Sequence, residues 1–347
     1  MTTTRSTPPR KPTRHDVARR AGVSDAVVSY TLNGRAPVAA ATAKRVREAI
    51  DELGYRPNQA ALALKSGSAH TLVLVVPDGV DPIFANPFFS EFASAIEQAA
   101  RSHGYALYTT ASSFEPEIVV ERFHEFAARQ VDGVLVLPGA APLDRVSLDR
   151  VGIPWLELNV SSPEYGVASL GPDLRRGGQT ATAHLFEHGH RRVAFIGEPD
   201  AAEPRWVGWL EACAAAGVAA GPFYGAQITR PGGYEAGRRM AADPDRPAAV
   251  FVATDRMATG VLRAFHEQGV RVPEDIAIVS FDGSWEGEYS WPSLTSFRQP
   301  IEAMAESAVA RLLARSDAPE EPRHEFFDGA LVLRRSCGCD APAAPVD

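Results

Sequence analysis

Residues 13 to 33 read TRHDVARRAGVSDAVVSYTLN, a stretch that predicts two short helices joined by a turn at Gly22. Thr13 and Asp16 have the spacing of a capping box, in which each side chain satisfies a backbone N–H group at the start of a helix. Gly22 can adopt the left-handed backbone that ends the first helix, and Ser24 can cap the second. Short helices joined in this way are typical of the helix-turn-helix, whose second helix enters the major groove of DNA.

The second of these helices is expected to have an apolar side and a polar side. Val28 and Leu32 have helical spacing, so both can turn toward a core shared with the first helix. Val23, just before the helix, can pack against Val28. The remaining side chains would face outward and meet DNA: Asp25, Ala26, Ser29, Tyr30 and Asn33.

The charge of the chain is divided unevenly along its length. The whole chain has a net charge of −8, but residues 1 to 70 have 12 Lys and Arg against 5 Asp and Glu, a net of +7. The remaining residues therefore have a net charge of −15. A basic segment attached to an acidic body is typical of a protein that binds nucleic acid through that segment.

The length of 347 residues implies either a small domain and a larger one or three comparable units. A third helix is predicted over residues 40 to 53, with Gly54 ending it, and would complete a three-helix domain. The segment after Arg56 is prone to form a short helix and leads into a flexible Ser-Gly-Ser. We expect a disordered arm at 1–12, a helix-turn-helix DNA-binding domain at 13–56, a hinge helix and linker at 57–70, a core at 71–340 and a tail at 341–347.

From residue 71 onward, short apolar runs alternate with amphipathic helices. Such runs read as strands of a parallel sheet that is buried on both faces. They lie at 71–76, 106–109, 133–137, 155–158, 193–196, 250–253 and 276–281, with helices such as 87–102, 173–188 and 255–268 between them. One sheet does not need so many strands, which favours an α/β core of two doubly wound subdomains that bind ligand between them.

The sequence lacks the marks of membrane insertion, export and enzymatic chemistry. It has no apolar run of about eighteen residues and no apolar segment near its start, so neither a membrane span nor a secretory signal is predicted. It contains no P-loop, dinucleotide-binding glycine motif, nucleophile elbow or zinc-protease motif. We therefore expect a cytoplasmic protein that is not an enzyme, with no catalytic residue, no cofactor and no membrane partner.

The three cysteines are expected to be reduced thiols. Cys213, Cys337 and Cys339 are too few for a disulfide framework. Cys337 and Cys339 form a Cys-Gly-Cys pair, but no further zinc ligands accompany them in the sequence. Elsewhere in the chain, His188 and His190 flank a glycine in a predicted helix-to-strand turn, where a structural role is expected. No metal site is therefore predicted.

From residue 13 to about residue 337, the chain resembles the lactose-repressor-like (LacI/GalR) family of bacterial transcription regulators. The resemblance rests on motifs that occur in a fixed order and spacing: Asp16-Val-Ala-x-x-Ala-Gly-Val-Ser24, Ser29-x-x-Leu-Asn33, Leu53-Gly-Tyr-x-Pro-Asn58, Asn86-Pro-Phe-Phe89, Gly189-His-Arg-Arg192, Arg205-x-x-Gly208, Val272-Pro-Glu-Asp275 and Arg334-x-Ser336.

The resemblance implies an all-α headpiece on a periplasmic-binding-protein-like core. It implies a homodimer that represses genes from a pseudo-palindromic double-stranded DNA operator and responds to a small-molecule effector, for which a sugar is the leading expectation. Crossing connections would assign 71–160 and 299–328 to the first subdomain, and 161–298 and 329–340 to the second. The alternative is a solute-binding protein of the transport type, which would need a signal sequence and would not need residues 13 to 65.

The resemblance also implies roles for individual residues at the DNA. Ser24, Ser29 and Asn33 would contact phosphates, while Asp25, Ala26 and Tyr30 would contact bases. Thr13, Asn58 and Lys65 are further residues expected to bind DNA. Asp25 fits a second role equally well, as a first-turn carboxylate that complements the helix dipole. Leu64 would wedge into the minor groove at the operator centre. The chain departs from the family at Tyr30, where arginine is common, and at Ala39, where a serine or threonine usually caps the third helix.

The effector would be held between the two subdomains. The resemblance implies that Arg205 and Asp255 clamp the ligand, a pairing that suits the vicinal hydroxyls of a sugar. Asn159 follows a predicted strand and offers a hydrogen-bonding group. Phe88 and Phe89 can stack on a sugar ring, although core packing is the alternative for one of the two, since adjacent helix positions do not share a face.

Overall fold

The computed structural model describes residues 12–34, 36–56, 68–77, 86–113, 115–137, 143–160, 168–198, 203–314 and 324–339. The chain divides into two compact units, residues 1–69 and 70–347, and each is described by itself. The expected arm up to Lys11, the tail at 341–347 and the predicted DNA contacts Asn58, Leu64 and Lys65 lie outside the described residues.

The first unit begins with three helices: α1 (Arg14–Ala21), α2 (Asp25–Asn33) and α3 (Ala40–Leu53). The predicted capping box is present, since Thr13 Oγ1 accepts the Asp16 N–H and the Asp16 carboxylate accepts the Thr13 N–H at 2.9 Å. Gly22 ends α1 with a φ of 68°, a conformation that favours glycine. Ala39 precedes α3 without a side-chain cap, as its methyl group requires.

The core of the headpiece confirms one of the two inward predictions for α2 and contradicts the other. Val28 is fully buried, but Leu32 is 39% exposed. Leu32 lies one turn beyond Val28, close to the end of α2 at Gly34, and it is not part of the buried cluster. The cluster itself consists of Val17, Ala18, Ala21, Val28, Val46, Ala49 and Tyr55.

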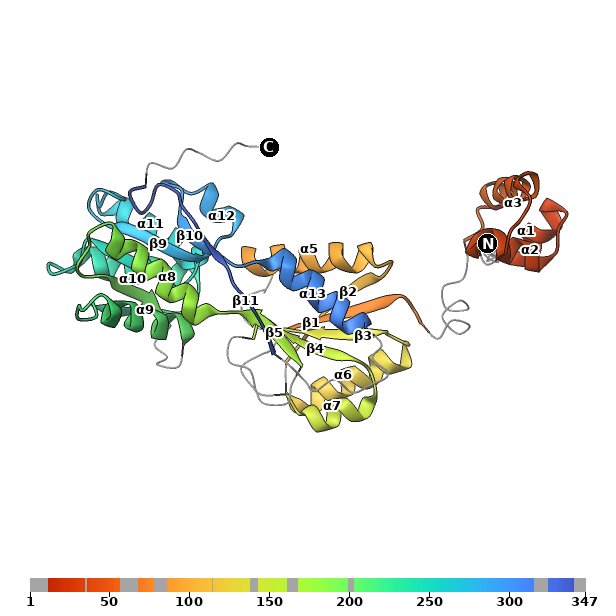
Figure 1. Ribbon diagram of the computed structural model, residues 1–347, viewed down its shortest axis with the longest axis horizontal. Coiled ribbons are helices and arrows are strands. Elements are labelled where there is room, and N and C mark those ends of the chain that lie inside the picture. The colour runs from red at the N-terminus through yellow and green to blue at the C-terminus, as the bar shows by residue number, and fades with distance from the viewer. Residues whose placement is uncertain are drawn as a thin grey trace, which may run out of the picture. The chain divides into compact units, whose positions relative to one another are not determined.

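In the second unit, a first sheet has the strand order β11-β5-β4-β3-β1-β2, and every pairing in it is parallel. Its strands are β1 (Thr71–Pro77), β2 (Ala106–Ser112), β3 (Gly133–Val136), β4 (Trp155–Leu158), β5 (Ser169–Pro172) and β11 (His324–Phe327). Helices α5 (Pro87–Ser102) and α13 (Ile301–Leu313) cover one face, and α6 (Pro116–Ala128) and α7 (Arg145–Val151) cover the other (Figure 1). Both faces are apolar because alternate residues of β1 point to opposite sides, with Leu72 packing among the first pair of helices and Val73 among the second.

A second sheet in the same unit has the order β12-β10-β9-β8-β6-β7, and only β12 runs antiparallel to its neighbour. Its strands are β6 (Ala194–Gly197), β7 (Phe223–Gly225), β8 (Ala249–Val252), β9 (Ala277–Asp282), β10 (Thr295–Arg298) and β12 (Ala330–Val332). Its helices are α8 (Leu174–Glu187), α9 (Pro204–Ala215), α10 (Arg230–Ala242), α11 (Asp255–Glu267) and α12 (Trp285–Glu288). The predicted α/β core of two doubly wound sheets is confirmed.

The chain crosses between the two sheets three times. After β5 it enters α8, after β10 it enters α13, and after β11 it enters β12. The first crossing falls later than expected, because β5 pairs with β4 and so extends the first subdomain to Pro172 rather than residue 160. We refer to the portions built on the first and second sheets as the first and second subdomains.

Glycines bring two helix pairs of the second subdomain into backbone contact. A Cβ atom built on Gly208 in α9 would lie 2.1 Å from the Arg175 carbonyl oxygen of α8. The same distance separates a Cβ built on Gly260 in α11 from the Arg230 carbonyl of α10. Only glycine permits so close an approach.

No helix in the described ranges combines the length and the apolar character needed to cross a bilayer.

Candidate functional site

The side chains expected to touch DNA are partly engaged within the headpiece. Ser24 Oγ accepts the Val27 N–H at 3.4 Å, so Ser24 is the N-cap of α2. The Asp25 carboxylate lies 3.7 Å from Arg14 Nε and 3.3 Å from His15 Nδ1, both on α1. This contact with α1 is a third role for Asp25, which the sequence did not reveal because it depends on how the two helices pack.

Other side chains of α2 are open to solvent. Ala26 is exposed, Tyr30 is 43% exposed and Ser29 is half-buried. Thr13 uses its hydroxyl in the capping box, where it donates to the Asp16 carboxylate at 2.7 Å. The side chain of Asn33 lies outside the described residues. The outer surface of α2 therefore presents Ser24, Ala26 and Tyr30, with Leu32 as an unforeseen neighbour.

In the second subdomain, Asp255 is a buried acceptor at the start of α11. The hydroxyls of Ser280 and Ser296 donate to its Oδ1 at 2.5 and 2.7 Å. Ser284 donates to its Oδ2 from the backbone N–H at 2.7 Å and from the hydroxyl at 2.9 Å. Burial raises the pKa of the Asp255 carboxyl above its ordinary value, and the hydrogen bonds oppose that rise. Each carboxylate oxygen of Asp255 already accepts two hydrogen bonds, so a ligand hydroxyl that binds Asp255 would have to replace one of the serine donors.

Arg205 at the start of α9 is also buried, with 9% of its surface exposed. Its Nε donates to the Glu203 carboxylate at 2.7 Å, and a second nitrogen donates to the Ala253 carbonyl at 2.9 Å. Its guanidinium lies 5.4 Å from the centre of the Phe281 ring. Burial lowers the pKa of Arg205, but the carboxylates of Glu203 and Asp282 outweigh burial and raise that pKa above its ordinary value.

Asp282 belongs to the same cluster, although the sequence did not single it out. It ends β9 with a φ of 108°, and its Oδ1 accepts the Gln299 side-chain amide at 2.8 Å. Burial, followed by the charge of Asp255, raises the pKa of the Asp282 carboxyl well above its ordinary value, while Arg205 opposes the rise. The sequence signal would have been the Asp282-Gly283 pair, a typical turn sequence, directly after the apolar run at 276–281.

Asp282→Asn is expected to raise the melting temperature at neutral pH. A carboxyl whose pKa is raised by folding stabilises the folded state below its unfolded pKa of about 4 and loses that contribution as pH rises through the folded pKa. The variant should gain most over the parent near pH 7, with the difference shrinking toward pH 4 in thermal unfolding.

Asp275→Asn is the comparison variant, because folding lowers the pKa of Asp275 whereas it raises the pKa of Asp282. The hydrogen bond from the Arg271 side chain lowers the pKa of Asp275 to about 2, so this carboxylate stabilises the fold above pH 4 and loses its effect as pH falls toward 2. Asp275→Asn should therefore lower the melting temperature at neutral pH. An Asp282→Asn protein that is also less stable near pH 7 would contradict the argument from burial.

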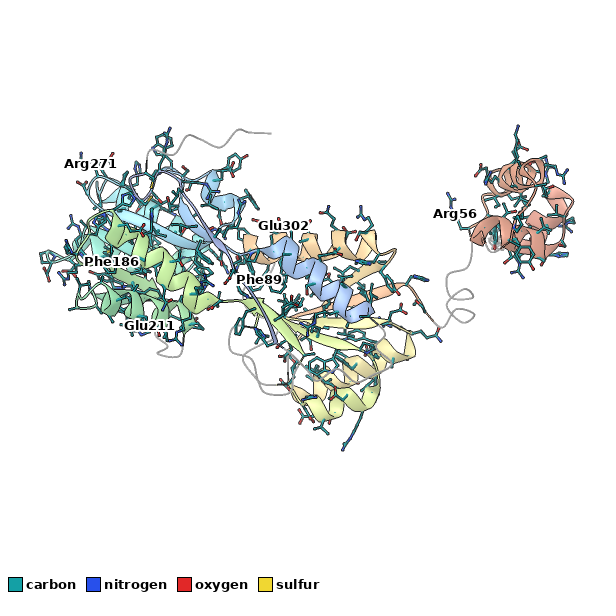
Figure 2. All side chains as sticks on the ribbon, viewed as in Figure 1. Arg56, Phe89, Phe186, Glu211, Arg271 and Glu302 are labelled. Atoms are coloured by element: carbon teal, nitrogen blue, oxygen red, sulfur yellow. The ribbon has the colours of Figure 1, made fainter. Side chains whose placement is uncertain are left out.

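The first subdomain contributes the start of α5. Asn86 caps this helix by accepting the Phe88 N–H at 3.2 Å. Phe88 is 4% exposed and packs in the core against Phe92, which favours the core-packing alternative for Phe88. Phe89 is half-buried, with its ring edge-on to Phe88 at 5.1 Å, and it lies at the end of α5 nearest the second subdomain (Figure 2). Of the two rings, only Phe89 remains a candidate.

Asn159 follows β4 with a left-handed φ of 58°. Its Oδ1 is buried and accepts no hydrogen bond from any of the described residues. A buried amide oxygen without a donor costs about 1–3 kcal/mol, and a ligand hydroxyl would supply the missing donor. Asn159 therefore has the chemistry of a ligand contact, although no contact found in the described ranges joins it to Arg205 or Asp255.

One hydrogen bond links the two subdomains beside these candidates. Glu91 of α5 accepts the backbone N–H of Trp285, the first residue of α12, at 3.0 Å. Burial raises the pKa of Glu91, and the charge of Asp255 adds to that rise. Trp285 directly follows Ser284, which binds Asp255. The hydrogen bond between the subdomains and the hydrogen bonds to Asp255 therefore come from adjacent residues of one turn, Ser284 and Trp285.

The Cys-Gly-Cys pair also differs from its expectation. His184 and His188 of the α8 end lie beside Cys337 and Cys339, so the pair does have further ligand-type side chains close to it. Burial raises the pKa of the Cys337 thiol, but hydrogen bonds with His184 and Thr295 outweigh burial and bring that pKa to about 7. The sequence hid this group because about 150 residues separate its two halves.

Comparisons with known proteins agree with this architecture. Residues 13–58 match the bacterial regulatory proteins of the lacI family, and residues 182–337 match a periplasmic binding protein-like domain. The transcriptional regulator CelR of Thermobifida fusca is 36% identical over 342 residues, which cover 94% of this chain and 98% of CelR. The repressor CytR of Escherichia coli K12 is 31% identical over 331 residues, 93% of this chain and 96% of CytR.

Solved structures give the same result. The lac repressor dimer bound to operator and the anti-inducer ONPF aligns with a TM-score of 0.78 at 25% identity, over 94% of this chain and 99% of that chain. A complex of CelR with cellobiose aligns with a TM-score of 0.67 at 32% identity, over the same shares. These relatives are transcription regulators rather than enzymes, and a transport-type binding protein would leave residues 13–58 unexplained. The chain therefore belongs to the lacI family of bacterial regulatory proteins.

Proposed function

We propose that this chain is a repressor that binds a pseudo-palindromic operator as a homodimer and releases it when a sugar enters the core. One observation carries the proposal: a headpiece with an exposed helix α2 shares a chain with a two-subdomain core, in which the buried Asp255 network adjoins a hydrogen bond between the subdomains. Regulators of this kind act in the cytoplasm, where their DNA lies.

At the DNA, we propose that α2 lies in the major groove with Ala26 and Tyr30 against base edges. Ser24 and Ser29 would fix the position of the helix on the phosphates. Asp25, held by Arg14, would contact a base only if that ion pair opened. Further contacts would come from Thr13, Asn33, Asn58 and Lys65.

For the effector, we propose a sugar or sugar derivative that binds Arg205, Asp255, Asn159 and Phe89. Support comes from the mixture of charged, amide and aromatic groups, which suits a polyhydroxylated ring. Further support is the CelR relative, whose solved structure is a cellobiose complex. The buried Asn159 Oδ1 accepts no hydrogen bond from the described residues and could accept one from a ligand hydroxyl.

The serine network around Asp255 suggests how binding would reach the DNA. A sugar hydroxyl that replaced Ser284 on Asp255 would release the turn that begins α12. The same turn donates the Trp285 N–H to Glu91 of the other subdomain. Ligand would thereby change the contact between the subdomains, and the operator affinity and the sugar affinity would be coupled reciprocally.

The test is selection of genomic fragments by the purified chain, followed by gel-shift titration of the selected duplex against a panel of mono- and disaccharides. We expect a palindromic site that is bound with strong salt dependence and released by one class of sugar. Failure to retain any fragment at low salt would rule out the repressor. Operator binding that no sugar changes would rule out the proposed effector class alone.

Leu64→Ala should weaken operator binding by about tenfold or more, because the kinked DNA would lose its apolar wedge. DNA bending measured by fluorescence energy transfer should fall as well, while sugar binding stays unchanged. Leu62→Ala is the matched control, with the same side-chain loss two residues away. Equal losses in the two variants would show that Leu64 has no special place at the operator.

A further inference from the structure

Two cysteines and two histidines meet where the end of α8 lies against the turn after β12. The group consists of His184, His188, Cys337 and Cys339, here called the Cys-His cluster, and its four nitrogen and sulfur ligand atoms all lie within 4.8 Å of one another. His184 and Cys337 are buried, Cys339 is half-buried and His188 is exposed. The Cys-His cluster lies in the second subdomain, and no hydrogen bond or ion pair found in the described residues joins it directly to Arg205 or Asp255.

Three sulfur-nitrogen distances within the Cys-His cluster are close to those of a tetrahedral metal site. Cys337 Sγ lies 3.3 Å from His184 Nε2, and Cys339 Sγ lies 3.3 Å from His188 Nε2. Cys339 Sγ is also 3.6 Å from His184 Nε2. With Zn–S bonds of about 2.3 Å and Zn–N bonds of about 2.0–2.1 Å at tetrahedral angles, neighbouring sulfur and nitrogen ligands are about 3.5 Å apart. The side chains therefore need little movement to enclose one ion.

Local backbone features aim all four side chains at one point. His184 and His188 are four residues apart at the end of α8, so they lie on one face of the helix. Gly338, between the two cysteines, has a φ of 91°, a conformation that favours glycine. A Cβ atom on Gly338 would lie 3.8 Å from His188 Nδ1, which shows how closely this turn approaches the histidine.

Surrounding groups support ligands in the way that outer partners of zinc sites do. Glu187 Oε2 is 3.7 Å from Nδ1 of His184, the ring nitrogen that the cluster does not use. The Thr295 hydroxyl is 3.0 Å from Cys337 Sγ. Carboxylates beside ligating histidines and hydroxyls beside ligating sulfurs orient the ligands and tune their basicity.

We propose that the Cys-His cluster binds one zinc ion as a structural site. Two thiolates and two imidazoles are a ligand set that suits zinc, and four protein ligands leave no open position for a substrate. The ion would fasten the turn after β12 to the end of α8. Among the described residues, β12 is the edge strand of its sheet and pairs with β10 alone, so this fastening would hold the end of the sheet in place.

The test uses the full-length, untagged chain purified without chelator. We expect about one zinc per chain by mass spectrometry of metals, and on cobalt substitution the intense visible bands of a tetrahedral site with a thiolate charge-transfer band. His188→Ala and Cys339→Ser should reduce bound zinc to below about 0.2 per chain, since both residues are at the accessible side of the cluster. Strong chelation should lower the melting temperature of the parent and leave that of Cys339→Ser unchanged.

Matched controls are His190→Ala and Cys213→Ser, which remove the same residue types outside the cluster and should keep full zinc content. The proposal fails if the parent contains no zinc and shows no thiolate band with cobalt. It fails equally if all four variants bind as the parent does, or if an intact-mass measurement finds Cys337 and Cys339 joined in a disulfide. None of these outcomes depends on operator or sugar binding.

Discussion

Arg205→Met is expected to lower the free energy of unfolding by about 3–5 kcal/mol, because it leaves a buried carboxylate without its partner. Glu203 and Arg205 are both almost fully buried, and the pair is joined at 2.7 Å. The substitution also removes the donor to the Ala253 carbonyl. Urea unfolding followed by far-ultraviolet circular dichroism measures the effect.

Two further variants make the Arg205 result specific. Adding Glu203→Gln to Arg205→Met should restore part of the stability, since glutamine leaves no unpaired charge in the core and its oxygen can still accept the Trp206 N–H. Arg175→Met breaks an exposed ion pair with Glu211 and should leave the unfolding midpoint nearly unchanged. Equal losses at Arg175 and Arg205 would show that burial of the ion pair is not the cause.

Gly208→Ala is expected to destabilise the second subdomain by about 1–3 kcal/mol, although alanine is the better helix former by about 1 kcal/mol. The new methyl group would meet the Arg175 carbonyl at 2.1 Å and the Gln179 nitrogen at 2.8 Å. Since these are backbone atoms of α8, no side chain can turn aside, and α8 and α9 must separate.

Ala214→Gly is the control for Gly208→Ala, since it makes the reverse exchange on the exposed side of α9. It should cost about 1 kcal/mol from helix propensity alone. Both variants are therefore expected to be less stable than the parent by urea unfolding. A Gly208→Ala protein more stable than the parent would show that the helices accommodate the methyl group.

The sequence predicted elements whose signals are local. Helix α5 begins and ends where the Asn-Pro start and the apolar stripe place it, from Pro87 to Ser102. The long apolar strands were equally clear, because a run such as β1 is buried along its length. Strands β5 and β7 were missed since they are short and contain glycine, and only pairing with a neighbouring strand makes them regular.

The residues proposed for the candidate site came from the sequence, whereas their contacts within the fold did not. Arg205 and Asp255 were identified through the family resemblance, yet the serines that fill Asp255 come from β9, β10 and the turn before α12. The sequence could not show which of Phe88 and Phe89 faces the core, because that depends on how α5 packs against its sheet. The histidines of the Cys-His cluster gave no signal beside Cys337, since sequence spacing reports ligands only when they lie near one another along the chain.

The late strands β11 and β12 have a consequence for synthesis on the ribosome. The first sheet receives its edge strand β11 and the second its edge strand β12 only from residues 324–332, whereas the headpiece core is complete at Tyr55. At about 5–20 residues per second, the interval between the two events is on the order of tens of seconds. Each nascent chain thus has a finished DNA-reading domain well before it has a finished sensor. A message broken within that interval would encode a headpiece attached to a core that lacks an edge strand of one or both sheets.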